Sequence, residues 1–269
     1  MGEGSEMKER SIQWLMAVSA VSFLVWMGGL AWTLQHYFSD AAPAPIERAP
    51  AAQDEPYTPV VEDGSFRVLA LGDSLTRGTG DPEGKGYIGY MLDRLKEKSE
   101  QEIVVENYGV NGQTSGQLAS LLRERELQAQ VKAADVIVIS IGGNDLFRGG
   151  ETLGHLDPVK IQEIESAYLR ELDGILKQLR EENAAARIFL IGLYNPFIEL
   201  QETEITSRIV RDWNYKAAEV ASRYPQTVLV PTFDLFQLKV QDYLARDLFH
   251  PNADGYRLIG ERVASLITW

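Results

Sequence analysis

Five short runs of apolar residues constrain the fold of this chain most, because the intervals between them leave room for helices. The runs are rich in Val, Ile and Leu, and they occupy residues 66–71, 102–106, 135–141, 187–193 and 226–231. Apolar strands without polar alternation are typical of a parallel sheet that is covered on both faces. Helical periodicity follows the runs over Tyr87 to Lys98, Thr114 to Arg125, Pro158 to Glu182, Glu204 to Arg223 and Asn252 to Ile267. We therefore predict an α/β fold, a three-layer α/β/α sandwich on a five-stranded parallel sheet.

Polar motifs follow the first three apolar runs. They are GDSLTRG at residues 72–78, NYGVNG at 107–112 and IGGND at 141–145. In a parallel sheet these strand ends meet at one edge, where ligands bind. A serine at that edge can act as a nucleophile, although Ser74 alone would also fit a turn or a helix N-cap. A glycine amide and an asparagine side chain are uncharged donors of the kind that stabilise an oxyanion.

The segment DLFHPN at residues 247–252 places Asp247 three residues before His250, just ahead of the last predicted helix. Serine, histidine and aspartate are the parts of a nucleophile, a general base and the group that orients the base. The chain has three histidines. His36 lies at the edge of an apolar N-terminal segment, and His155, the rival base, is better explained as a solvated loop residue.

Taken together, these four blocks resemble the GDSL, or SGNH, hydrolases, a family of lipases, esterases and related acylhydrolases. The family's Ser, Gly, Asn and His match Ser74, Gly112, Asn144 and His250 in order, and Asp247 matches its acidic residue. The resemblance covers roughly residues 66 to 269. It implies a flavodoxin-like sandwich and a Ser74–His250–Asp247 triad. It also implies an oxyanion hole formed by Ser74, Gly112 and Asn144, and it calls for no metal and no cofactor.

Other features of the chain argue against competing functions. The net charge of −13 and the pI of about 4.8 disfavour a nucleic-acid partner. The absence of cysteine excludes a thiolate nucleophile and Cys-ligated zinc. The loop 78–86 fits neither phosphate-binding glycine signature, and no serine lies in a G-x-S-x-G motif. Asp73 is expected to organise the site, by capping the following helix and by fixing the Ser74 loop.

The first 64 residues are predicted to lie outside the catalytic domain. We expect a short cytoplasmic N-terminus at 1–12, a transmembrane signal anchor at 13–35, an Ala/Pro-rich linker at 36–64 and the hydrolase domain at 65–269. From Trp14 to Leu34 the chain carries no charge over 21 residues, enough to cross a bilayer. Lys8 and Arg10 precede this span, whereas the next Lys or Arg is Arg48, which favours an extracytoplasmic domain on a single-pass anchor. Secretion after signal cleavage is the alternative.

The predicted activity is hydrolysis of a carboxylic ester, and the substrate is a small-molecule, lipid or acylated-sugar ester. A cell-wall carbohydrate O-deacetylase, a lysophospholipase or a thioesterase would use the same mechanism. A different class of function, a non-catalytic surface-binding module, would keep the fold without needing an intact Ser74, Asp247 and His250.

Overall fold

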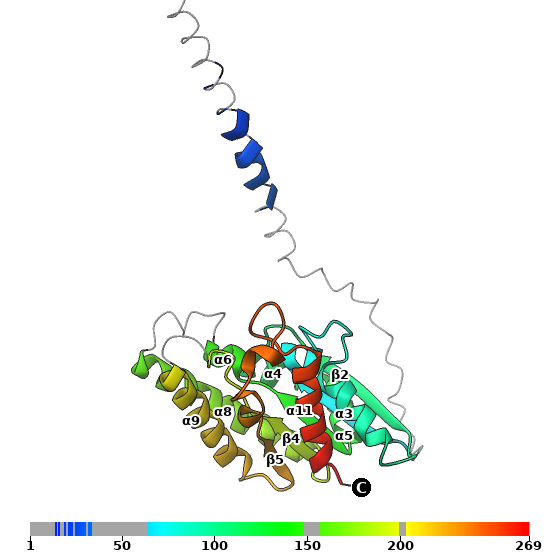
Figure 1. The fold of residues 1–269 in the computed structure, drawn as a ribbon. Coiled ribbons are helices and arrows are strands. Elements are labelled where there is room, and N and C mark those ends of the chain that lie inside the picture. Colours follow the sequence, from blue (N-terminus) through cyan, green and yellow to red (C-terminus); the bar gives the residue numbers. More distant parts are fainter. Residues whose placement is uncertain are drawn as a thin grey trace, which may run out of the picture. The chain divides into compact units, whose positions relative to one another are not determined.

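The computed structural model describes residues 64–147, 157–198 and 203–268, together with part of 14–33. The chain divides into two units, Met1–Pro59 and Val60–Trp269. Figure 1 shows the second unit as a sheet flanked by helices.

A parallel sheet forms the centre of the second unit. Its strands, among the residues described, are β1 (Phe66–Gly72), β2 (Ile103–Gly109), β3 (Val136–Ser140), β4 (Arg187–Ile191) and β5 (Thr227–Val230). They lie in the order β2-β1-β3-β4-β5, and all neighbours are parallel. The predicted five-stranded parallel sheet is therefore confirmed. Because β2 and β3 lie on opposite sides of β1, the gap between β1 and β3 is the topological switch point, where ligands of such sheets bind.

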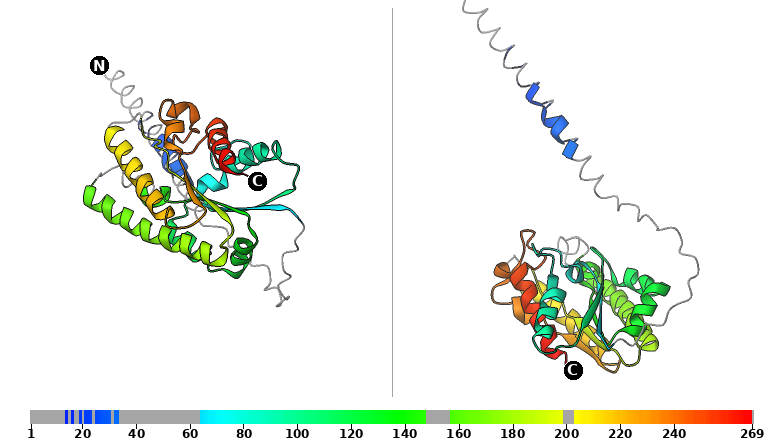
Figure 2. Two further views of the ribbon diagram at one scale, coloured as in Figure 1. Left: turned by 90° about the horizontal axis from the view of Figure 1, so that it is seen from below. Right: turned by 90° about the vertical axis from the view of Figure 1, so that its right-hand side faces the viewer.

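Side chains of β1 alternate between two hydrophobic clusters. Leu69 and Leu71 belong to one cluster, Val68 and Ala70 belong to the other, and each is at most 2% exposed. The first face is covered by α4 (Ser115–Leu121), α5 (Arg125–Ala133), α8 (Pro158–Glu182) and α9 (Thr203–Ala221), and the second by α3 (Gly86–Lys96), α10 (Phe233–Phe236) and α11 (Ala253–Leu266). Figure 2 shows helices on both sides of the sheet, which is the expected three-layer arrangement.

The helix predicted over Thr114 to Arg125 is wrong, because the structure has two helices there. The first, α4, ends at Leu121 and the second, α5, begins at Arg125. Tight turns separate them, with the Arg123 amide donating to Ser120 O at 3.2 Å and the Glu124 amide donating to Leu121 O at 3.0 Å. The helix expected after Asp73 is the single turn α2 (Ser74–Arg77). The sequence analysis did not predict the short elements α6 (Gly143–Phe147), α10 and η2 (Val240–Tyr243).

The longest described helix, α8, has the predicted bounds, and its first turn explains why it begins where it does. The Asp157 carboxylate accepts a hydrogen bond from the Val159 amide at 2.9 Å, and Pro158 occupies the first helical position. A proline at that position needs no hydrogen-bond partner and already has a helical φ. The N-cap and the proline together fix the start of the helix.

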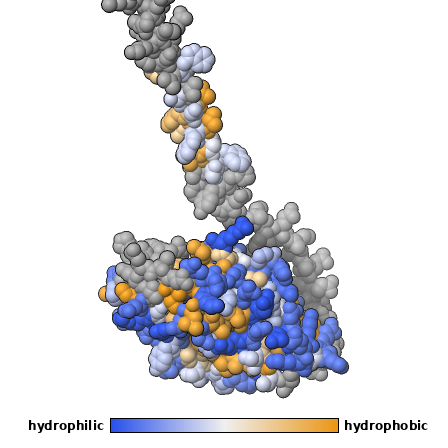
Figure 3. Space-filling view, in the orientation of Figure 1, coloured by the Kyte–Doolittle hydropathy of each residue, from blue (hydrophilic) through white to orange (hydrophobic). Residues whose placement is uncertain are grey.

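In the N-terminal unit, the described residues between Trp14 and Thr33 are helical. Aliphatic and aromatic side chains among them, including Val21, Phe23 and Val25, are exposed. Figure 3 shows hydrophobic, orange surface on this segment. Over the parts of the chain that the structure describes, no helix is long and apolar enough to cross a bilayer. The predicted segment 1–12, much of 13–35 and nearly all of the linker 36–64 lie outside the described residues.

Candidate active site

The loop that carries Ser74 turns sharply at the end of β1. A side chain at Gly72 would overlap the backbone of Ser140, the last residue of β3, and φ at Gly72 is +134°. The Asp73 amide donates to Ser140 O at 3.0 Å, which joins the ends of the two strands. Glycine is therefore required at position 72, and the turn places Ser74 at the switch point of the sheet.

Asp73 is the N-cap of α2 and begins a buried chain of hydroxyl groups. Its Oδ1 accepts from the Leu75 amide at 3.0 Å and from Ser140 Oγ at 2.7 Å. Ser140 Oγ lies 2.7 Å from Thr76 Oγ1, which lies 2.7 Å from the Tyr87 hydroxyl. Because buried polar networks with every member paired are rigid, these contacts fix the helical turn on which Ser74 lies.

Burial raises the pKa of Asp73 to about 6. Hydrogen bonds from Ser140 and Leu75, and the field of His250, oppose this effect of burial. Above that pH the folded protein holds a charged carboxylate in a dry environment, which destabilises it relative to the unfolded chain.

We expect Asp73→Asn to reveal this cost as a pH dependence. The pKa is raised on folding, so Asp73 destabilises the wild type increasingly as pH rises from about 4 to about 6. The difference in unfolding free energy, variant minus wild type, should therefore increase by on the order of 3 kcal/mol between pH 4 and pH 7.5. Urea unfolding of both proteins at both pH values measures this difference. Any packing penalty of the amide introduced at position 73 that does not depend on pH cancels when the two pH values are compared. A difference for Asp73→Asn that is the same at both pH values would contradict this explanation.

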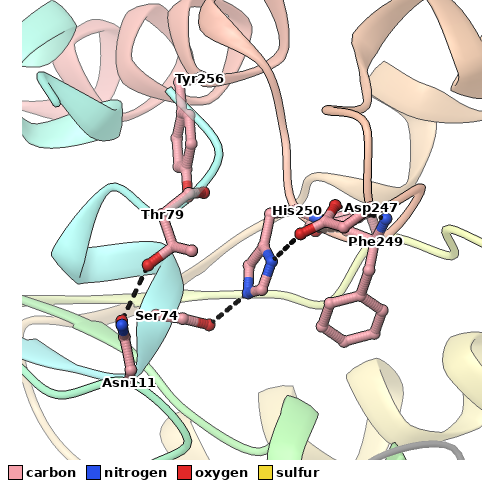
Figure 4. A network of polar contacts seen from close by, with 8 residues as sticks. Ser74, Thr79, Asn111, Asp247, Phe249, His250 and Tyr256 are labelled. Carbon is pink, nitrogen blue, oxygen red and sulfur yellow. Dashed lines mark hydrogen bonds and ion pairs between the residues drawn. The ribbon is translucent and has the colours of Figure 1, made fainter. Parts of the chain in front are cut away.

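Ser74, His250 and Asp247 lie together in hydrogen-bond contact (Figure 4). Ser74 Oγ is 2.8 Å from His250 Nε2, and His250 Nδ1 is 2.7 Å from Asp247 Oδ2. With Nδ1–H donating to the carboxylate, Nε2 is free to accept the serine proton. Of the other histidines, His36 and His155 lie outside the described residues.

A tight turn holds Asp247 against His250. Asp247 Oδ1 accepts from the amides of Phe249 and His250, both at 3.0 Å. Leu248 lies between them in the left-handed region, with φ at +55°. Burial raises the pKa of Asp247, but the hydrogen bonds from His250 and from the two amides outweigh this effect and lower the pKa overall. The carboxylate therefore stays ionised where it can orient and stabilise a protonated imidazole.

The two predicted oxyanion donors lie on adjoining turns. Gly112 follows β2, in a turn with φ at +76°, and Asn144 lies on α6, after β3. Asn144 Nδ2 donates to Gln113 O at 2.9 Å, which ties the two turns together and leaves a second amide hydrogen. Among the described residues, the backbone amides of Ser74 and Gly112 have no hydrogen-bond acceptor.

A small apolar cavity adjoins Ser74. It has a volume of about 40 Å³, and its lining residues are Asp73, Ser74, Leu75, Gly143, Asn144, Phe147, Gly192, Leu193, Tyr194, Pro196, Phe249 and His250. Gly112 does not line this cavity. The rings of Phe147 and Phe249 meet edge to face at 5.8 Å between centroids, and the Tyr194 hydroxyl donates to Phe249 O at 2.6 Å. The ring contact and the hydrogen bond therefore both hold Phe249 in place at the edge of the cavity.

Several of these residues were missed by the sequence analysis. Ser140 had a readable signal, because it is a polar residue that ends an otherwise apolar strand. Tyr87, Gly192 and Leu193 had none, since they come from segments that only the fold brings together. In the parts of the chain that are described, no group of three His, Asp or Glu side chains could hold a metal ion.

Comparison with known proteins finds similar sequences and similar folds. The model of the GDSL-like lipase/acylhydrolase family matches residues 70–258. The chain is 36% identical to YpmR of Bacillus subtilis (strain 168) over 205 residues, or 74% of this chain and 80% of that protein. It is 28% identical to the spore germination lipase LipC of Bacillus licheniformis over 208 residues, covering 74% of this chain and 95% of LipC. The crystal structure of the lipase Lip_vut3, from a goat rumen metagenome, superposes with a TM-score of 0.69 at 27% identity and covers 75% of this chain and 97% of that one.

Proposed function

The chain belongs to the GDSL-like lipase/acylhydrolase family and is a serine ester hydrolase, and we propose that Ser74, His250 and Asp247 carry out the reaction. The observation that carries this proposal is the continuous contact from Ser74 Oγ to His250 Nε2 at 2.8 Å and from His250 Nδ1 to Asp247 at 2.7 Å. A serine hydroxyl is a weak nucleophile until such a base removes its proton.

In the first half of the reaction, Ser74 Oγ attacks the ester carbonyl carbon while His250 Nε2 takes the hydroxyl proton. The carbonyl oxygen becomes an oxyanion, which the amides of Ser74 and Gly112 and the second hydrogen of the Asn144 amide stabilise. Collapse of this intermediate breaks the bond to the alcohol oxygen. The alcohol leaves with the proton from His250, and the acyl group stays on Ser74.

In the second half, water replaces the alcohol. His250 takes a proton from the water as the water oxygen attacks the acyl carbon. The intermediate then collapses to a carboxylic acid, the bond to Ser74 Oγ breaks, and His250 returns the proton to Ser74 Oγ. Asp247 holds the imidazole in place in both halves and stabilises its positive charge. None of these steps requires a group that the chain itself lacks.

The cavity beside Ser74 supports a preference for short acyl groups. Its apolar lining suits a hydrocarbon chain, and its volume of about 40 Å³ is small for a ligand pocket. Leu193, Phe147 and Phe249 form its wall. A long chain would have to displace these side chains or leave the cavity.

We expect full-length protein to hydrolyse p-nitrophenyl acetate and butyrate with a kcat/KM about tenfold or more above that for the octanoate, because a misfit in an apolar pocket costs about 1–3 kcal/mol. Leu193→Ala should narrow that ratio, and a matched control, Leu238→Ala at a 90% exposed position, should leave it unchanged. Equal rates for all chain lengths would remove the proposed preference.

The alternative substrate classes can be tested with the same full-length protein. Faster turnover of lysophospholipid, of an acyl-thioester or of an O-acetylated sugar would identify a lysophospholipase, a thioesterase or a carbohydrate deacetylase. No hydrolysis of any ester, with Ser74 unreactive, would support a non-catalytic binding module.

We also propose that the enzyme is anchored in the cell membrane by residues 13–35 and works outside the cytoplasm. The support is the uncharged span from Trp14 to Leu34, preceded by Lys8 and Arg10. Protease added to intact cells should digest the domain 65–269, and the full-length chain should sediment with membranes. Recovery of a soluble form that begins near Ala42 would instead indicate a cleaved signal peptide.

A further inference from the structure

Thr79, five residues after Ser74, is hydrogen-bonded to all three of the segments that carry the Ser74, Gly112 and His250 blocks. Its amide donates to Ser74 O at 3.0 Å, and its Oγ1 donates to Asn111 Oδ1 at 2.8 Å. Its own carbonyl oxygen accepts from the Tyr256 hydroxyl at 2.7 Å. Figure 4 shows Thr79 between Tyr256 and Asn111, on the side of Ser74 away from Phe249.

The contact with Tyr256 connects Thr79 to the segment that carries the base. Tyr256 is fully buried in α11, which begins three residues after His250. Burial raises the pKa of Tyr256, so its hydroxyl stays protonated and donates to Thr79 O. The next residue, Gly80, has φ at +97°, and a side chain there would overlap Pro251 O and the His250 side chain.

The contact with Asn111 holds the apex of the turn that presents Gly112. The base of that turn is fixed by the Val110 amide, which donates to Gly72 O at 2.8 Å, and by Asn144, which donates to Gln113 O at 2.9 Å. In the described part of the chain, Thr79 makes the one side-chain hydrogen bond to the two apex residues, Asn111 and Gly112. Both apex residues are exposed, so packing does not hold them.

We propose that Thr79 is a positioning residue, whose hydroxyl aims the Gly112 amide at the oxyanion. This inference rests on the proposed function, in which the Gly112 amide is an oxyanion donor. Thr79 touches neither the reacting atoms nor the substrate cavity, so it acts through Asn111 and Gly112. A donor that contributes to the transition state alone changes kcat and leaves the binding of substrate unaffected.

The test replaces Thr79 with Val, which keeps the shape and both backbone hydrogen bonds and removes the hydroxyl donor. With p-nitrophenyl acetate and full-length protein, kcat should fall about tenfold, a part of what a lost oxyanion donor costs, and KM should stay within about twofold. Thr79→Ser should restore kcat. The control is Thr227→Val, at the amino end of β5, whose hydroxyl donates to Pro225 O at 3.3 Å; kcat should not change.

Asn111→Ala removes the same hydrogen bond from its exposed partner, so it provides a second test that does not depend on the folding of Thr79→Val. The double variant should be no slower than either single variant, because all three lack one interaction. Additive losses, an unchanged kcat, or a raised KM with unchanged kcat would each overturn the positioning role. Failure of the wild type to hydrolyse esters would instead overturn the proposed function itself.

Discussion

Replacing Ser74 with Ala is expected to lower kcat for p-nitrophenyl acetate by about 10⁴-fold or more and to leave a folded protein. The reason is that the acyl group then has no oxygen to which it can transfer. His250→Ala should cause a loss of the same order, because the hydroxyl of Ser74 keeps its proton. Asp247→Asn should lower kcat by a smaller factor, since the orienting group contributes less to catalysis than the base in some triads.

The most informative measurement is the residual kcat of the double variant, in which Ser74 and His250 are both replaced with Ala. Residues that act as a unit show strongly non-additive losses, so the double variant should retain about the same residual kcat as either single variant. Circular dichroism and melting curves on the same preparations show whether each variant is folded. A His250→Ala enzyme with near-normal turnover would mean that another base, such as His155, serves Ser74.

Asn144→Ala should lower kcat by roughly 100-fold or more and leave KM nearly unchanged, because its amide donates to an oxygen that becomes charged only in the transition state. The structure adds a second consequence. Asn144 Nδ2 also donates to Gln113 O at 2.9 Å, so the variant should lose about 1 kcal/mol of unfolding free energy as well.

A matched control separates these two consequences. Asn183 donates to Val131 O at 2.8 Å and to Ala134 O at 2.9 Å, at the end of α8 and away from the cavity. Asn183→Ala should lower the melting temperature and keep kcat per folded molecule unchanged. If Asn144→Ala behaves in the same way, Asn144 is structural and must be removed from the proposed oxyanion hole.

The sheet was predictable because each strand is a run of apolar residues. Val136 to Ile139 in β3 are fully buried. Because helices cover both faces of the sheet, such a strand appears in the sequence as a continuous apolar run. Most short elements were not predictable. A single turn such as α6 or α10 is too short to show a helical period, and the break between α4 and α5 has no glycine or proline to mark it.

The four blocks of the candidate site could be read from the sequence, because each has a distinctive residue at a strand end or before a helix. The contacts that hold these blocks together could not be read from the sequence. The link from Asp73 to Ser140 depends on the register that places Gly72 of β1 opposite the end of β3. Likewise, Thr79 meets Tyr256 across 177 positions of the chain, which no local pattern reveals.

The reaction of full-length protein with a fluorophosphonate is the most direct test of Ser74 as the nucleophile, because this reagent forms a covalent adduct with an activated serine. Trypsin releases Ser74 in the peptide 68–77, where it is the one serine. We expect one adduct per chain, on that peptide at Ser74, and no adduct in Ser74→Ala. An adduct on a different residue, or full labelling of Ser74→Ala, would show that Ser74 is not the nucleophile.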